Sequence, residues 1–342
     1  MDTACDGCQN KHKGKHDISE GSSRHVCKCR SRAESIKIDP GLDQAAANPG
    51  DELKASPGNR RPDRTHYQEE LQSRIIKSIK DLPPMPQVVI KIQGLISDLN
   101  SDITDLAEII ESDQAVAAKV LKMANSAYYG MSGKISSIHQ ASVLLGYQVL
   151  GEIVTMAGVV GILSGSMPGY GYDAQELWKH SLSAALSAKM IAAIKNKDLM
   201  HEAHTAGLIH DVGKIILDRY ILENMDQISV YMVQEEKSFL DAERFIFGFD
   251  HAEIASEVCR AWKIPEKISL AISCHHQPSY SCGDELSYVL HLADHIAAKS
   301  GASYDEDEAF AELETGTLEF IGIGRDEIRD IMLQVLEAIE QF

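Results

Sequence analysis

Apolar residues recur three or four positions apart along most of the chain from Tyr67 onward. The first such stretch places Leu71, Ile75 and Ile79 on one helical face. No stretch alternates convincingly between apolar and polar residues, so the pattern gives no support for strands. The sequence therefore predicts an all-α fold, a helical bundle with further helices at 87–99, 103–111, 113–124, 139–165, 174–195, 201–220, 222–236, 251–262, 266–275, 285–300 and 325–341.

The pattern also divides the chain. Residues 1–64 are polar and rich in Ser, Gly, Pro and charge, which predicts a disordered tail. A main domain is expected at 67–300, with an N-terminal lobe at about 82–165 and a core at about 173–300. Residues 301–342 combine an acidic loop with an amphipathic helix. We expect this helix to pack back on the domain, with a dimerisation helix as the alternative.

The tail carries a cluster of potential metal ligands. A Cys-x-x-Cys pair brings two thiolates to one ion, whereas the Cys-x-Cys spacing that follows is poor for a zinc ribbon. The sequence leaves open a small zinc knuckle or an unstructured, thiol-rich tail. The residues concerned are Cys5, Cys8, His12, His16, His25, Cys27 and Cys29.

Charge narrows the classes of partner. The chain of 342 residues has a formal net charge of -18. Residues 1–62 contain 11 Lys and Arg against 9 Asp and Glu, so the negative balance lies in the predicted domain. Such a surface argues against nucleic acid and anionic membranes as partners. The N-terminus lacks the apolar core of a signal peptide, and the apolar run at 153–163 is too short to span a bilayer. We therefore expect a cytoplasmic location.

The densest chemical signal is the segment HTAGLIHDVGK, which contains the adjacent pair His210–Asp211. An imidazole and a carboxylate at one point suit a divalent cation, and the carboxylate can bridge two ions. Lys214 follows three residues later, on the same face if the helix continues.

Further candidates occur before and after this segment. Glu176 and His180 are four residues apart on a predicted helix and therefore share a face. Imidazoles and carboxylates together favour iron, manganese or zinc at a multinuclear site. The alternative for each histidine taken alone is a hydrogen-bonded core residue, and we interpret His201, His204, His291 and His295 as surface or packing residues. The predicted ligands are Glu176, His180, His210, Asp211, His251, His275, His276 and Asp294.

Seven separated segments between Leu82 and Ala298 together resemble the HDOD domain. In chain order they are LPPMPQVVIKI, DLAEIIESDQAVAAKVLKMANSAYYG, ISSIHQASVLLG, LWKHS, AGLIHDVGK, FGFDHAEIASEVCRAW and HHQP. The resemblance implies an N-terminal helical lobe packed on an HD-type helical core. It also implies a role as an output or scaffold module in bacterial signalling.

The candidate ligands are in addition similar, position by position, to those of the HD-GYP phosphodiesterases. That likeness implies that all eight hold two or three metal ions, that Asp211 is catalytic and that Lys214 contacts a phosphate oxygen. His276 is followed by Gln277, Pro278, Ser279 and Tyr280 and not by a GYP loop. The GYGY at 169–172 lies before the first of the predicted ligands, where that motif does not belong, and we interpret it as a chance match.

Three functions follow from these observations. The first is a signalling output or adaptor module with a retained divalent metal site, which contacts signalling proteins through its N-terminal lobe. The second is an active metal-dependent phosphohydrolase or phosphodiesterase with a nucleotide, cyclic or linear, as ligand. The third is a metal-free interaction scaffold in which the histidines merely satisfy one another.

Overall fold

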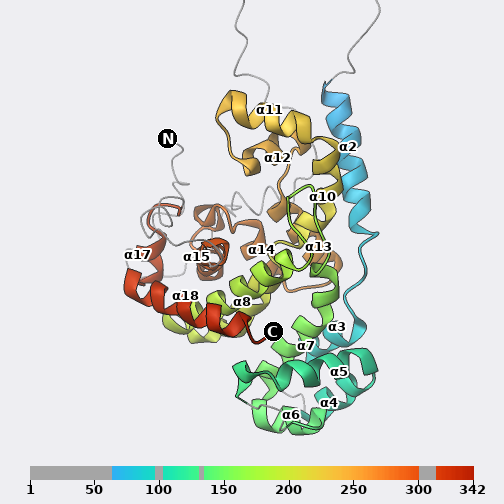
Figure 1. Cartoon of the computed structure of the whole chain (residues 1–342), viewed down its shortest axis with the longest axis vertical. Coiled ribbons are helices and arrows are strands. Elements are labelled where there is room, and N and C mark those ends of the chain that lie inside the picture. The colour runs from blue at the N-terminus through green and yellow to red at the C-terminus, as the bar shows by residue number, and fades with distance from the viewer. Residues whose placement is uncertain (1–63, 97–102, 131–134, 300–312) are drawn as a thin grey trace, which may run out of the picture.

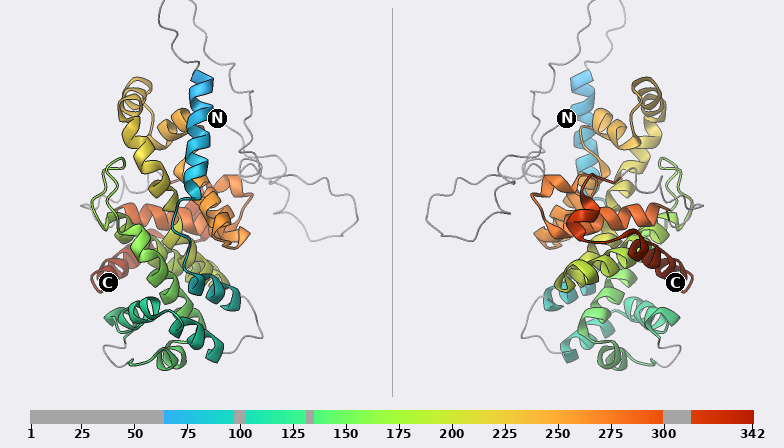
Figure 2. Two further views of the ribbon diagram at one scale, coloured as in Figure 1. Left: turned by 90° about the vertical axis from the view of Figure 1, so that its right-hand side faces the viewer. Right: turned by 90° about the vertical axis from the view of Figure 1, so that its left-hand side faces the viewer.

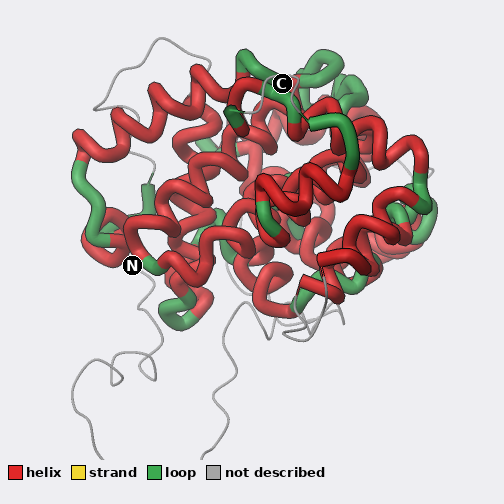
Figure 3. Tube along the Cα trace, turned by 90° about the horizontal axis from the view of Figure 1, so that it is seen from below, coloured by secondary structure: helices red, strands yellow, loops and turns green. Residues whose placement is uncertain are grey.

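The computed structural model describes residues 64–96, 103–130, 135–299 and 313–342. Within these residues the regular structure is helical, and extended pairing is limited to one isolated bridge between Met167 and Tyr172 (Figure 3). The all-α prediction is confirmed. The predicted tail with its Cys and His residues and the acidic loop before residue 313 lie outside the described residues.

Five helices form the N-terminal lobe at one end of the molecule (Figure 1). Its centre is α7, which is apolar on nearly all sides and fully buries Leu150, Ile153 and Met156. The helices α3, α5 and α6 pack against α7. The bounds are α3 (Gln87–Ile96), α4 (Ile103–Glu111), α5 (Gln114–Ala124), α6 (Ile138–Leu145) and α7 (Tyr147–Leu163), with a 3-10 turn η2 (Ala127–Tyr129).

The core is built around α8, which packs against both α9 and α15. A second layer pairs α10 with α13 and α13 with α14. The elements of the whole core are α8 (Glu176–Lys195), η3 (Lys197–Leu199), α9 (Met200–Ile209), α10 (Val212–Glu223), α13 (His251–Ala261), α14 (Glu266–Ser273), η4 (Pro278–Ser281) and α15 (Glu285–Lys299). Burial of Ile191, Leu208, Leu217, Ile254 and Leu290 forms its interior.

Three helices stand at the end opposite the lobe, as both views of Figure 2 show. They are α2 (Arg64–Ile79), α11 (Met225–Glu235) and α12 (Phe239–Phe247). The face predicted for α2 is the packed one, since Leu71 and Ile75 are buried against the core. Ser78 Oγ also lies 2.7 Å from the buried hydroxyl of Tyr220.

The C-terminal segment returns to the core, as predicted. The helix α18 (Arg325–Ile339) follows the short α17 (Thr317–Ile321) and packs against α8. Ile328, Met332 and Val335 are buried in this contact. The boundaries of tail, lobe, core and C-terminal segment remain proposals. No helix in the described part of the chain is long and apolar enough to cross a membrane.

Two predicted helices are each two helices. The predicted helix 139–165 breaks at Gly146, whose φ of 79° lies in a region that favours glycine. The predicted helix 201–220 breaks at His210–Asp211, where Asp211 has φ -98° and ψ 7°. Apolar periodicity runs through both breaks, which is why the pattern did not reveal them. The pattern also missed α12 and α17.

A buried charged group joins the lobe to the core. Glu152 of α7 is 3% exposed, and its carboxylate accepts from Lys189 Nζ at 2.6 Å and lies 2.5 Å from His201 Nδ1. Burial opposes the charge, but His204, His201 and Lys189 together lower the pKa of Glu152 to about 2. His204 is fully buried beside them, as predicted for a packing residue, and burial lowers its pKa to about 4 against the opposing pull of Glu152.

His204 should therefore make folding depend on pH. The unfolded chain protonates this imidazole near its ordinary pKa of 6.5, whereas the folded chain does so only near 4. The free energy of unfolding is therefore not reduced by His204 above pH 6.5. It falls by roughly 3 kcal/mol as the pH is lowered from 6.5 toward 4, because the unfolded chain binds this proton first. Chemical denaturation of the wild type and His204→Leu across this range should show the difference, since the leucine variant lacks this part of the slope. Parallel curves would contradict the assignment.

Candidate metal centre

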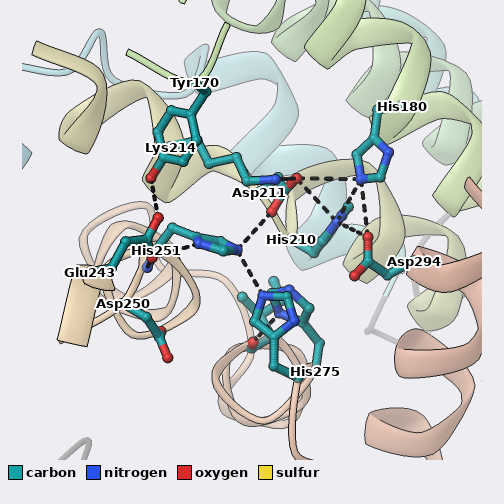
Figure 4. Close-up of polar contacts among 12 residues, drawn as sticks. Tyr170, His180, His210, Asp211, Lys214, Glu243, Asp250, His251, His275 and Asp294 are labelled. Atoms are coloured by element: carbon teal, nitrogen blue, oxygen red, sulfur yellow. Dashed lines mark hydrogen bonds and ion pairs between the residues drawn. The ribbon is translucent and has the colours of Figure 1, made fainter. Parts of the chain in front are cut away.

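The break between α9 and α10 presents the His210–Asp211 pair to the middle of the core. Asp211 occupies the N-cap position of α10, and both side chains are buried. Four other segments direct side chains to the same point (Figure 4). The residues brought together are His180 from α8, His210 and Asp211, His251 at the start of α13, His275 and His276 after α14, and Asp294 from α15.

The ligand atoms fall into three overlapping groups, each within 4.8 Å. The groups are His180–His210–Asp211, His210–His275–Asp294 and His251–His275–His276.

Asp211 touches both ends of the cluster. Its Oδ2 lies 3.3 Å from His180 Nε2 and 3.5 Å from His210 Nε2, while its Oδ1 lies 3.4 Å from His251 Nε2. The carboxylate therefore has the position of a bridge between two cations.

Hydrogen bonds on the far side of three rings fix which nitrogen faces the centre. His210 Nδ1 donates to Gly207 O at 2.8 Å, and His275 Nδ1 donates to Ile272 O at 2.7 Å. His251 Nδ1 donates to the Glu243 carboxylate at 2.8 Å. Each Nε2 therefore directs a lone pair inward, the arrangement found around metal-binding histidines.

This donor set fits divalent cations. His180 Nε2 and His210 Nε2 are 3.3 Å apart, and His251 Nε2 and His276 Nε2 are 2.8 Å apart. Two donors bound to one ion at about 2.1 Å would lie roughly 3.0–3.4 Å apart, a spacing that the first pair has and that the second pair falls slightly short of. Within this cluster, Asp211 Oδ1 and His275 Nε2 are buried without a hydrogen-bond partner among the described residues. Buried acceptors of this kind are costly unless a cation or donor satisfies them.

The electrostatics keep most ligands in binding-competent form. Burial raises the pKa of Asp211, but His210 and Lys214 lower it more, so the net pKa lies well below its usual range. Burial and the neighbouring His210 lower the pKa of His275 to about 3. His180 and His251 differ, because neighbouring carboxylates favour their protonated forms. Burial opposes the charge of His180, but hydrogen bonds to Asp211 and Asp294 raise its pKa to about 9. Burial likewise opposes the charge of His251, but Glu243 raises its pKa above the ordinary value. A cation must therefore displace a proton at His180 and compete with one at His251.

Lys214 lies at the edge of this cluster, within reach of Asp211. Its Nζ lies 2.5 Å from Asp211 Oδ2, and its side chain is 13% exposed. The ammonium also lies 5.7 Å and 5.5 Å from the ring centres of Tyr170 and Tyr172. Burial opposes the charge, but Asp211 raises the pKa of Lys214 above its ordinary value, so it stays cationic.

Glu176 is outside the three groups formed by the described residues. Its side chain is exposed at the start of α8, and Oε2 accepts from the Asp173 backbone N–H at 2.6 Å. Its role as a ligand stays a prediction. His291 is a packing residue as predicted, because its Nδ1 donates to His275 O at 2.7 Å and its Nε2 accepts from Glu314 N.

Sequence reasoning missed Glu243 and assigned no role to the GYGY segment. That segment is no match to a GYP loop, yet it lies beside the cluster: Tyr170 Oη donates to Glu243 Oε1 at 2.6 Å. Glu243 is fully buried and orients His251. Its position eight residues before His251, on a helix the pattern did not reveal, carried no signal of this role.

Gly213, two residues after Asp211, allows α10 to approach α13. A Cβ at this position would lie 2.0 Å from His251 O and 2.7 Å from Ala255 N. Gly213→Ala should therefore displace the start of α13 and cost about 2–3 kcal/mol of unfolding free energy. The matched control is Gly161→Ala in α7, where a Cβ meets nothing within 4 Å and alanine should be neutral or slightly stabilising. Denaturant unfolding measures both; equal stabilities would contradict this account.

The sequence profile of the HDOD domain matches residues 82–278, more than half of the chain. A curated relative, an uncharacterized protein of Treponema pallidum (strain Nichols), is 24% identical over 212 residues. That match spans 60% of this chain and only 40% of the relative.

Solved structures share the fold. An HDOD domain protein of unknown function from Geobacter sulfurreducens matches with a TM-score of 0.65 and 23% identity, over 81% of this chain and 98% of that one. A protein from Shewanella amazonensis SB2B, provisionally named a phosphohydrolase, matches with a TM-score of 0.63 and 22% identity, over 79% and 98%. A protein from Marinobacter aquaeolei VT8, provisionally named a signal transduction protein, matches with a TM-score of 0.59 and 21% identity. This match covers 82% of this chain and 65% of that one.

Proposed function

The chain belongs to the HDOD family, and on that premise we propose that it is a signal-transduction output or adaptor module whose core holds a divalent metal centre. One observation supports the proposed metal centre most directly: inward-facing Nε2 atoms from separate helices meet around the Asp211 carboxylate. Buried acceptors in this cluster have no hydrogen-bond partner among the described residues. The family and the provisional name of the Marinobacter relative support the signalling role.

The residues proposed to hold the ions are the seven that converge, with iron, manganese or zinc as the cations. Two ions are the natural count, because Asp211 reaches both ends of the cluster through different oxygens. Glu176 remains a proposed additional ligand. Signalling proteins are the proposed partners, and the N-terminal lobe at about 82–165 is the proposed contact surface.

A second function is favoured by Lys214. An ammonium ion held beside a bridging carboxylate is well placed to bind a phosphate oxygen, and the Shewanella relative bears a provisional phosphohydrolase name. Divalent ions, when bound, supply Lewis acidity toward phosphoryl groups and acidify water. Lys214 would bind and orient a nucleotide phosphate, and Asp211 would hold the ammonium in place.

Hydrolysis assays on metal-loaded protein separate these functions. The panel should contain a chromogenic phosphodiester together with linear and cyclic nucleotides, each tested with iron, manganese and zinc. The adaptor function predicts bound metal with the same background rate for the wild type and Lys214→Ala. Hydrolysis by the wild type at ten or more times the rate of Lys214→Ala would overturn it in favour of the phosphohydrolase. Protein that takes up no metal would favour the third function, a metal-free scaffold.

A further inference from the structure

The connector between α7 and α8, residues 164–175, is anchored beside the candidate metal centre. Asp218 Oδ1 accepts from the N–H of Gly169 at 2.8 Å, and Met167 and Tyr172 exchange backbone hydrogen bonds of 2.8 and 2.9 Å. A Cβ at Gly169 would lie 2.2 Å from Asp218 O, so glycine is required for this contact with α10. The connector thus has a defined position, with Tyr170 at its tip.

Tyr170 and Glu243 form a chain of hydrogen bonds that ends on His251 (Figure 4). Tyr170 Oη donates to Glu243 Oε1 at 2.6 Å. Glu243 Oε2 accepts from His251 Nδ1 at 2.8 Å and from the His251 backbone N–H at 2.9 Å. Glu243 is fully buried, so the hydrogen bond from Tyr170 restrains the rotation of its carboxylate.

His251 is oriented differently from two other inward-facing histidines. His210 and His275 donate Nδ1–H to backbone carbonyls three residues earlier, in the turn that precedes each of them. His251 instead depends on the side chain of Glu243, which belongs to α12. A carboxylate partner fixes the tautomer and makes Nε2 more basic. Side-chain substitution can therefore alter the orientation of His251 while leaving that of His210 and His275 intact.

We propose that Tyr170 and Glu243 are positioning residues for His251, and that they set the affinity of the His251–His275–His276 group for its ion. The inference rests on the proposed function, because it assumes that the cluster binds metal. It assigns a role to the connector: the segment that joins the lobe to the core also holds one metal ligand in place. The ion bound by the His180–His210–Asp211 group should be independent of this chain of hydrogen bonds.

The test is a Co²⁺ titration of metal-free protein, followed by visible absorption and by elemental analysis. Wild type should bind two ions. Glu243→Gln keeps the shape of the side chain and removes its charge. It should lower the affinity for the ion at His251, His275 and His276 by about 10- to 100-fold and leave the affinity for the other ion unchanged. Tyr170→Phe, which keeps the ring and removes one hydrogen bond, should weaken the same ion by roughly 3- to 10-fold. Tyr128→Phe, in the 3-10 turn η2 of the N-terminal lobe, is the control and should match wild type.

The outcomes are distinct. Wild-type protein that binds no Co²⁺ would overturn the proposed function together with this inference. Wild type with two ions and variants with the same two affinities would overturn the inference alone. Equal loss of both ions in Tyr170→Phe and Glu243→Gln, with a lower Tm of the metal-free protein, would show a merely structural role and would also overturn it.

Discussion

Asp211→Asn is expected to lose both metal ions, with each affinity reduced by at least about 100-fold. The reason is that each Asp211 oxygen faces a different part of the cluster, Oδ2 toward His180 and His210 and Oδ1 toward His251. Asparagine keeps the shape but replaces one oxygen with an N–H donor and removes the negative charge. Co²⁺ titration measures the loss. Asp226→Asn, in the first turn of α11, is the matched control and should bind as wild type does.

The same substitution should destabilise the protein even without metal. Asp211 is 1% exposed, and its carboxylate offsets the charge of Lys214 at 2.5 Å and interacts with His180 and His210. Removing one member of a buried ion pair typically costs about 3–5 kcal/mol, because the remaining charge stays desolvated. Denaturant unfolding of chelator-treated Asp211→Asn should show a loss of this order. Unchanged stability together with two bound ions would contradict the bridging role.

Removal of the metal from wild-type protein is the second large expected effect. A ligand that binds the folded state alone, at 100 times its Kd, adds about 2.7 kcal/mol, so two independent ions add roughly 5 kcal/mol. For a folded part of this size, each kcal/mol shifts Tm by about 2–4 °C, which gives roughly 10–20 °C. Differential scanning calorimetry of chelator-treated protein, before and after addition of excess metal, measures the shift.

Asp211→Asn serves as the control for that experiment. Its Tm should be nearly independent of added metal, because its ions bind at least two orders of magnitude more weakly. A wild-type Tm that responds neither to chelator nor to metal would contradict the account. A response of equal size in Asp211→Asn would mean that the metal binds elsewhere in the chain.

The sequence predicted the helical class and all seven residues that converge. The spacing of apolar residues indicates the all-α fold class, because helices that bury one face repeat their apolar residues every three or four positions. The convergence of His180, His251 and Asp294 on the His210–Asp211 pair could be predicted only through resemblance. Residues more than a hundred positions apart are brought together by packing, which spacing alone does not encode.

What could not be predicted depends on tertiary contacts. The break at His210–Asp211 lies within continuous apolar periodicity, so only the packed core shows that both side chains point inward. Glu243 had no signal, because its role follows from α12 lying beside the start of α13. The GYGY segment was dismissed from its place in the chain, whereas its backbone contact with Asp218 brings Tyr170 to Glu243. Glu176 shared a helix with His180, but its carboxylate caps the Asp173 N–H.

The metal content per chain tests the central claim most directly. Untagged protein should be purified without chelator and analysed by elemental analysis, both as isolated and after incubation with iron, manganese or zinc. The account predicts two bound equivalents of one of these metals, retained through gel filtration. Protein that contains no metal as isolated, and that takes up none on incubation, would contradict it and leave the converging histidines as a hydrogen-bonded core of an interaction scaffold.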